Sequence, residues 1–246
     1  FIWPEGILPD ILQHELVEYK YLFDKEFSEN HLLIMGINNK TDIDGSIKYY
    51  NSFSVYDHQL QLVNFYNKVN LVPFGEFLPF ENTLRIFGFR SLTNNYQSFS
   101  KGKHRNIMNL NQQNFLIKIM PLICYEIIYS GRLFDNPDFD LIINISEDGW
   151  FGKSIGPKQH FIHSIFRAIE SGKYIVRSSN NGVTAIINPI GNIEHKINQG
   201  YSSYIDLKGI KKIKPTIFSK YGNKVFGLLI LLYIFLIFSF IKIKNE

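Results

Sequence analysis

The feature that most constrains this chain is an uncharged apolar stretch close to its end. From Val225 to Ile241 the sequence reads VFGLLILLYIFLIFSFI, with a lysine on either side. Its 17 residues reach the lower limit for an α-helix that crosses the hydrocarbon core of a bilayer. A buried helix of a soluble domain is the alternative, but such a helix usually has a polar face. We therefore expect a membrane-spanning helix at 225–241, followed by a short basic tail at 242–246.

A basic segment at 208–224 precedes this stretch and holds much of the excess behind the net charge of +4. Next to a bilayer, its lysines would attract anionic headgroups. Because the segment adjoins an apolar span, a lipid surface is a better partner for it than nucleic acid. The positive-inside rule, applied to the lysines on both sides of the span, would place the large domain in the cytoplasm. This rule is weak for long domains.

Short apolar runs alternate with helix-like segments over residues 1–207, which we interpret as one globular domain. A helix is predicted from Gly156 to Ser171, with Pro157 in its first turn and Gly172 after its end. The pattern is typical of an α/β fold with a mixed, largely buried sheet. We predict strands at 32–38, 46–57, 114–124, 140–146, 173–179, 183–189 and 193–197. The opening FIWPE indicates the end of a buried strand, so we expect the chain to begin inside a domain.

Three stretches far apart in the sequence each place a reactive side chain at the end of an apolar run. They carry Glu5 in WPE, Lys68 in KVNLVPFGEFLP and Cys124 in ICYE. Taken singly, each has a structural explanation: a first-turn helix acid, a surface lysine, and a small buried hydrophobe. Taken together, they supply a base, a cation and a nucleophile. Cys124 is the only cysteine, so an internal disulfide is excluded.

Acyl transfer through a thiol needs all three groups. A thiol is mostly protonated at neutral pH, so a base must accept its proton. A carboxylate in a partly dry site has a raised pKa suited to that role. Attack on a carbonyl places negative charge on oxygen, which a fixed ammonium stabilises. The N–H of Tyr125 is a second donor for that oxygen, and the product would be a thioester.

The three motifs WPE, K-x-x-LVPFGE-x-x-P and ICYE resemble the Glu–Lys–Cys pattern of the carbon–nitrogen hydrolase (nitrilase) superfamily. Within it, the chain is most similar to the apolipoprotein N-acyltransferase family. The stretches DGWFGKSIGPKQH and FRAIESGKYIVRSSNNGVTAIINPIG agree with that family. The resemblance covers about Ile2 to Gly191 and continues through the terminal helix. Three motifs in the same order are more specific than any one of them.

This resemblance implies a function and a set of site residues. The catalytic residues would be Glu5 as general base, Lys68 as oxyanion-stabilising cation and Cys124 as acylated nucleophile. Supporting or substrate-binding positions are implied at Glu76, Tyr125, Glu126 and Trp150. The family moves a fatty acyl chain from a phospholipid to the N-terminal diacylglyceryl-cysteine of a bacterial apolipoprotein. No cofactor and no metal are expected.

The resemblance also implies a fold and a location. The expected fold is a nitrilase-like α-β-β-α sandwich, incomplete at its N-terminus, with a C-terminal transmembrane helix. The expected location is the periplasmic side of the inner membrane, and the family takes precedence over the lysine count. The family's N-terminal membrane helices and the first strand of its catalytic domain are absent, so a separate N-terminal membrane half is a possible partner. Ser146-Glu147-Asp148 stands where the family has TND, and Gly6 replaces a small polar residue.

Several other residues allow a second interpretation. His160 and His163 lie three apart on the predicted helix, but a structural role for His160 is favoured over metal binding because no further ligand has zinc-like spacing. Arg167 and Glu170 have the spacing of a helical ion pair. Two alternatives for the whole chain stay open. One is an amidase- or nitrilase-type hydrolase of a small substrate, and the other is an inactive fragment of the acyltransferase.

Overall fold

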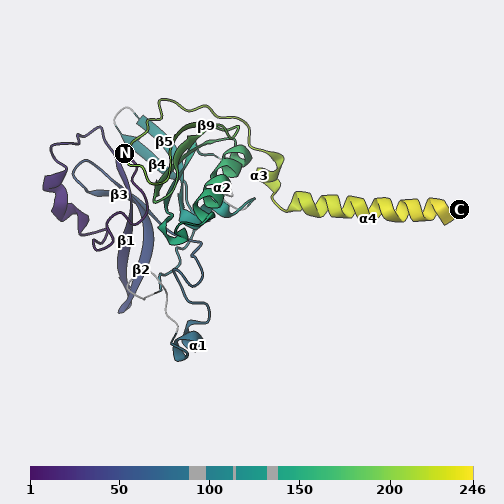
Figure 1. Cartoon of the computed structure of the whole chain (residues 1–246), viewed down its shortest axis with the longest axis horizontal. Helices are drawn as coiled ribbons and strands as arrows, with labels where there is room; N and C mark the ends of the chain where they lie inside the picture. Colours follow the sequence, from purple (N-terminus) through teal and green to yellow (C-terminus); the bar gives the residue numbers. More distant parts are fainter. Residues whose placement is uncertain (89–97, 113–114, 132–137, 246) are drawn as a thin grey trace.

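The computed structural model describes residues 1–88, 98–112, 115–131 and 138–245. Two β-sheets face one another and an apolar helix leads away from them (Figure 1). The smaller sheet is antiparallel, in the order β1-β2-β3, and the larger has the order β4-β5-β6-β7-β8-β9. The strands are β1 (Leu33–Ile43), β2 (Ser46–Tyr56), β3 (Leu62–Asn67), β4 (Met108–Gln112), β5 (Phe115–Ile123), β6 (Leu141–Glu147), β7 (Tyr174–Asn180), β8 (Thr184–Ile187) and β9 (Ile193–Ile197).

The opening residues of the chain lie along β1. Trp3 N–H donates to Ile34 O at 2.8 Å, and Gly36 N–H donates to Pro4 O at 3.1 Å. The two segments form a short parallel bridge at Ile2 and Ile34. The opening segment thus pairs with β1 but forms only an isolated bridge with Phe1 exposed, and not the end of a buried strand as predicted. The pairing with β1 fixes the position of Glu5 beside the smaller sheet.

The larger sheet is mixed, as the sequence predicts. Strands β5, β6 and β7 are parallel to one another, while β4, β8 and β9 pair antiparallel. Their continuous Ile and Leu runs suit strands that are covered on both faces. Because β5 and β6 are parallel, their carboxyl ends meet at one edge. Cys124 and Glu147 therefore lie on neighbouring strand ends.

Three apolar layers hold the structure together. The first lies between the sheets and joins residues such as Phe53 and Val55 to Ile119 and Ile143. The second packs the outer face of the larger sheet against α2 (Gly156–Ser171), through Ala168 among others. In the third, the segment that contains the 3₁₀ helix η1 (Leu16–Leu22) covers the outer face of the smaller sheet. Among the described residues this layer holds a 3₁₀ helix in place of the α-helix implied for the sandwich.

The remaining helices are short, except the last. They are α1 (Glu81–Ile86), the 3₁₀ helices η3 (Cys124–Ile128) and η4 (Gly149–Phe151), α3 (Ile217–Tyr221) and α4 (Lys224–Asn245). Figure 1 shows α4 pointing away from the sheets, with the C-terminus at its far end. Its stretch Lys224–Ile241 is long and apolar enough to cross a membrane by length and composition, and none of it is buried against the domain. The helix predicted at 225–241 is therefore present.

Candidate active site

Two acidic side chains surround one buried lysine. Lys68 Nζ lies 2.9 Å from Glu76 Oε1 and 3.4 Å from Glu5 Oε1. All three residues are buried, and Lys68 is only 1% exposed. The structure thus brings Glu5 together with Lys68 and Glu76, which lie eight residues apart in one stretch of the sequence. Such a charge in the interior is stable only when it is paired and hydrogen-bonded.

A fourth residue, Asn51 on β2, completes this cluster and was not identified from the sequence. Its side-chain N–H groups donate to Glu5 Oε1 at 2.6 Å and to Glu76 Oε1 at 2.7 Å. One amide therefore holds the two carboxylates around the ammonium. A lone Asn within the Tyr- and Ser-rich strand YYNSFS was the available signal. Nothing in that pattern tells which charged groups the amide contacts.

Backbone contacts set the position of Glu5 and Lys68. Glu5 Oε2 accepts a hydrogen bond of 2.8 Å from the backbone N–H of Glu147. Lys68 directly follows β3, where its N–H donates to Asn51 O and its carbonyl accepts from Gly102 N–H. A Cβ on Gly102 would lie 2.1 Å from Asn67 O, so glycine is required for this approach. The Ser146-Glu147-Asp148 departure from the family pattern thus still supplies a donor to Glu5.

Cys124 is the first residue of η3, where the chain turns at the end of β5. Its φ is +48°, a left-handed conformation that is strained for a residue with a side chain. The thiol is buried. Burial raises the pKa of the Cys124 thiol to about 12, and the negative charge of Glu5 adds to this, whereas Lys68 and a hydrogen bond with Ser146 oppose it. The thiol therefore lies within electrostatic reach of Glu5, Lys68 and Glu76, and it holds its proton at rest.

The charge on Lys68 is secure in this setting. Burial by itself would lower the pKa of Lys68, but the carboxylates of Glu5 and Glu76 outweigh it and hold the pKa well above its usual range. With Glu5 and Glu76 ionised, the cluster carries a net charge of −1, which disfavours a further negative charge on sulfur.

Glu126 is fully buried and holds the turn on which Cys124 lies. Its carboxylate accepts five hydrogen bonds of 2.6–3.0 Å, from Tyr66 Oη, Arg105 Nη2 and the N–H groups of Val69, Asn70 and Ile123. These bonds tie the loop after Lys68 to the residue before the cysteine. Glu126 therefore acts as a support for the site. Tyr125 packs at the edge of the inter-sheet core, and its ring meets that of Tyr129 edge-on.

Helix α2 holds both ends of the same turn. His160 Nε2 donates to Cys124 O at 3.1 Å, and Arg167 Nη1 donates to Ile128 O at 3.3 Å. The predicted Arg167–Glu170 ion pair is confirmed at 2.8 Å, and both residues are buried. Glu170 also accepts from Gly131 N–H, just beyond η3, at 2.7 Å. The helix thus contributes polar contacts along the whole nucleophile turn.

Trp150, which the resemblance marks as a supporting or substrate-binding position, is not part of this buried cluster. It belongs to η4, and its side chain is 61% exposed on the segment that follows Glu147. Among the described residues, no group of three or more His, Cys, Asp or Glu side chains is arranged to hold a metal ion.

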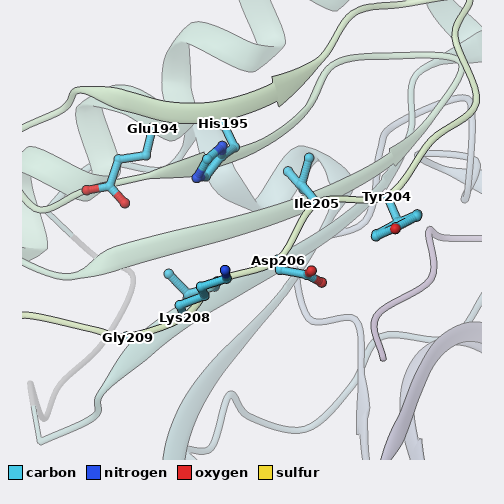
Figure 2. Close-up of a pocket in the computed structure, with 8 residues that line it drawn as sticks. Glu194, His195, Tyr204, Ile205, Asp206, Lys208 and Gly209 are labelled. Atoms are coloured by element: carbon cyan, nitrogen blue, oxygen red, sulfur yellow. The ribbon is translucent and has the colours of Figure 1, made fainter.

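A separate pocket of about 550 Å³ lies beside β9. Figure 2 shows Glu194 and His195 on one side of it and the segment from Tyr204 to Gly209 on the other. Neither Lys68 nor Cys124 lines it. We therefore place the candidate active site at the Lys68–Cys124 cluster and not at this pocket.

Comparisons with known proteins show the family to which this chain belongs. Residues 28–207 match the carbon–nitrogen hydrolase family. An apolipoprotein N-acyltransferase of Bradyrhizobium diazoefficiens is 34% identical over 242 residues, which are 96% of this chain and 44% of the relative. One of Rickettsia prowazekii is 36% identical over 226 residues, 90% of this chain and again 44% of the relative. The chain spans less than half the length of these curated relatives.

Solved structures share the fold at low sequence identity. The crystal structure of Saccharomyces cerevisiae Nit3, a member of the nitrilase superfamily, has a TM-score of 0.51 and 17% identity. It covers 76% of this chain, and the match spans 62% of Nit3. A variant of the amidase from Nesterenkonia sp. AN1 has a TM-score of 0.50 and 11% identity, covering 80% of this chain and 75% of the amidase. The nitrilase-superfamily fold and the resemblance to apolipoprotein N-acyltransferases are thereby confirmed, and the chain belongs to the carbon–nitrogen hydrolase family.

Proposed function

We propose that this chain carries the catalytic site of a lipoprotein N-acyltransferase. In this proposal, it moves a fatty acyl chain from a phospholipid, through a thioester on Cys124, to the N-terminal diacylglyceryl-cysteine of an apolipoprotein. The observation that carries the proposal is the buried set of Glu5, Lys68 and Glu76 whose charges act on the Cys124 thiol. The names of the relatives from Bradyrhizobium and Rickettsia support the choice of reaction.

The first half-reaction follows from the charges of the site. Glu5 accepts the thiol proton, and the thiolate attacks the carbonyl carbon of the phospholipid ester. Lys68 and the N–H of Tyr125 stabilise the negative oxygen of the tetrahedral intermediate. The C–O bond then breaks, Glu5 returns the proton to the departing lysophospholipid oxygen, and Cys124 is left as a thioester. Glu76 keeps Lys68 charged and in place.

The second half-reaction transfers the acyl group from Cys124 to the acceptor. The free α-amino group of the acceptor attacks the thioester, and Glu5 accepts a proton from the attacking amine. The C–S bond breaks, the proton passes to sulfur, and the amide product leaves. Both steps use the same base and the same oxyanion donors, as a two-step transfer through one nucleophile requires. The two half-reactions balance in bonds and protons without a cofactor.

The apolar helix α4 supports a membrane location for this reaction. Its exposed, uncharged surface suits the hydrocarbon of a bilayer, and the lysines of 208–224 suit anionic headgroups. We assign the catalytic domain to the periplasmic side of the inner membrane, by analogy with the acyltransferases it resembles.

Mass spectrometry tests the central step. The chain is mixed with phospholipid vesicles, with the N-terminal membrane part of a full-length relative supplied, and the peptide containing Cys124 is weighed. We expect an added acyl group in the wild type and none in Cys124→Ala. A wild-type peptide without the added mass would reject the acyltransferase mechanism.

A small-amide hydrolase is the second candidate, because a matched solved structure is that of an amidase with an active-site cysteine. A chain that ends at Asn223 would then release ammonia from simple amides as fast as the full chain does. If ammonia is released while Cys124 gains no acyl group from phospholipid, the hydrolase replaces the acyltransferase.

A further inference from the structure

The carbonyl of the proposed nucleophile has its own buried donor. His160 is 4% exposed, and its Nε2 lies 3.1 Å from Cys124 O. A carbonyl oxygen can only accept a hydrogen bond, so Nε2 carries the proton. On the other side of the ring, Nδ1 lies 2.9 Å from Asp148 Oδ1 and 3.2 Å from Arg177 Nη2. Both ring nitrogens are therefore engaged, which orients the imidazole.

The groups behind His160 are themselves held in place. Arg177 is fully buried, and its Nη2 donates to both oxygens of Asp148, at 3.0 and 2.8 Å. Ser146 Oγ also donates to Asp148 Oδ1, at 2.8 Å. A buried ion pair held by several hydrogen bonds resists movement, because breaking it would leave an unpaired charge. His160 is thus a donor whose position toward the carbonyl of Cys124 is fixed by its surroundings.

We propose that His160 is a positioning residue for acyl transfer, acting through the peptide unit that joins Cys124 to Tyr125. This inference rests on the proposed function. The carbonyl of Cys124 and the N–H of Tyr125 belong to one planar peptide and point in opposite directions. A donor on the carbonyl therefore orients the N–H, and it also polarises the peptide so that the N–H becomes a stronger donor. That N–H is one of the two groups assigned to the oxyanion.

The backbone of Cys124 needs such a contact. Its φ of +48° is a strained conformation that persists only when surrounding groups hold it. His160 bonds the carbonyl of that same residue, whereas Arg167 bonds the far end of the turn at Ile128. Of these two contacts of α2 with η3, only the one from His160 therefore orients the N–H of Tyr125, the proposed oxyanion donor.

Two substitutions distinguish the contact of the His160 ring with Asp148 from its contact with the carbonyl of Cys124. In His160→Asn, the amide can replace Nδ1 beside Asp148 but does not reach the carbonyl of Cys124. In His160→Gln, the longer side chain places an N–H where Nε2 stood. His163→Asn is the matched control, since His163 lies one turn further on α2, is half-buried, and packs beside the ring of Phe166. Thermal unfolding of each variant checks that the fold is retained.

Two rates are compared for each variant. The first is acylation of Cys124 by phospholipid, which builds an oxyanion. The second is alkylation of Cys124 by iodoacetamide, a displacement at carbon that builds none. We expect His160→Asn to slow acylation by about 10- to 100-fold and to leave alkylation within about twofold of the wild type. His160→Gln should regain most of the acylation rate, and His163→Asn should behave as the wild type.

A spectroscopic signature reports the contact without any activity. Because the chain has one cysteine, labelling the carbonyl carbon of Cys with ¹³C and the nitrogen of Tyr with ¹⁵N gives a single correlated peak, from the Cys124–Tyr125 peptide. Loss of the hydrogen bond in His160→Asn should shift the carbonyl resonance to lower frequency, and His160→Gln should restore it. An unshifted peak in His160→Asn would overturn the inference.

The possible failures can be told apart. If the wild type acylates and His160→Asn acylates equally fast, the inference alone is wrong. If acylation and alkylation fall together in His160→Asn, the residue supports the sulfur or the fold and the inference is also wrong. If the wild type forms no acyl-enzyme, the proposed function fails first, and the inference falls with it.

Discussion

The carboxylate of Glu5 accepts a hydrogen bond of 2.8 Å from the backbone N–H of Glu147, a residue 142 positions further along the chain. Glu147 ends β6 of the larger sheet, whereas Glu5 follows the segment paired with β1 of the smaller one. One bond thus joins the two sheets at the edge where Cys124 emerges. The proposed base is held by both sheets, so its position depends on how closely each backbone approaches it.

The approach of Glu5 to β1 requires a glycine at position 36. A Cβ on Gly36 would lie 2.4 Å from Glu5 Cα and 2.9 Å from Pro4 O. We expect Gly36→Ala to push the opening segment away from β1, lowering the free energy of unfolding by about 1–3 kcal/mol and acylation by about 100-fold. Urea unfolding and the acylation rate measure the two effects. Gly209→Ala is the matched control, because a Cβ there meets no atom within 4 Å, and equal effects in both variants would contradict the argument.

Glu126 supports the nucleophile turn through five donors, so its charge cannot be removed without cost. Glu126→Gln replaces one acceptor oxygen with an N–H₂ group that faces donors, and it leaves Arg105 without its buried counter-charge. We expect the free energy of unfolding to fall by about 3–5 kcal/mol, measured by urea unfolding. Glu26→Gln, at an exposed position, should change it by less than about 0.5 kcal/mol. Similar losses in the two variants would show that Glu126 adds little to stability.

The buried thiol makes stability depend on pH in the alkaline range. The pKa of Cys124 is about 12 in the folded chain against 9.0 for an ordinary thiol. The stabilisation is present below pH 9 and is lost as the pH rises toward 12, because the unfolded thiol ionises first. Between pH 9.5 and 10.5 the wild type should lose about 1.2 kcal/mol more than Cys124→Ala does. The two proteins share every other titrating group, so parallel curves from unfolding at each pH would contradict the raised pKa.

The apolar helix α4 should determine membrane association without adding to the stability of the domain. We expect a chain that ends at Asn223 to leave the membrane pellet after a high-salt wash, which weakens the attraction of its lysines for headgroups. Its free energy of unfolding in detergent should stay within about 0.5 kcal/mol of the full chain, because none of the apolar stretch of α4 is buried against the sheets. Sedimentation and urea unfolding provide the two measurements. A truncated chain that still sediments would place the membrane contact elsewhere.

Much of the fold could be predicted from local patterns. Helix α2 begins and ends at the predicted residues, because Pro157 suits its first turn and Gly172 adopts the left-handed conformation that ends it. The long Ile- and Leu-rich strands were also predicted. Strands β3 (LVNFYN) and β4 (MNLNQ) were missed, since their asparagines mask the alternation of polar and apolar residues. Both lie at the edge of a sheet, where the apolar pattern need not continue on both faces.

The sequence by itself determined the identity of the candidate site residues, the family and the apolar terminal helix, because motifs and uninterrupted hydrophobicity are local properties of the chain. Only the tertiary structure decided that Asn51 bridges Glu5 and Glu76, and that His160 bonds the carbonyl of Cys124. These contacts join residues 25–46 positions apart. They depend on the pairing of strands and the packing of α2 against the nucleophile turn, and no spacing within a motif encodes that geometry.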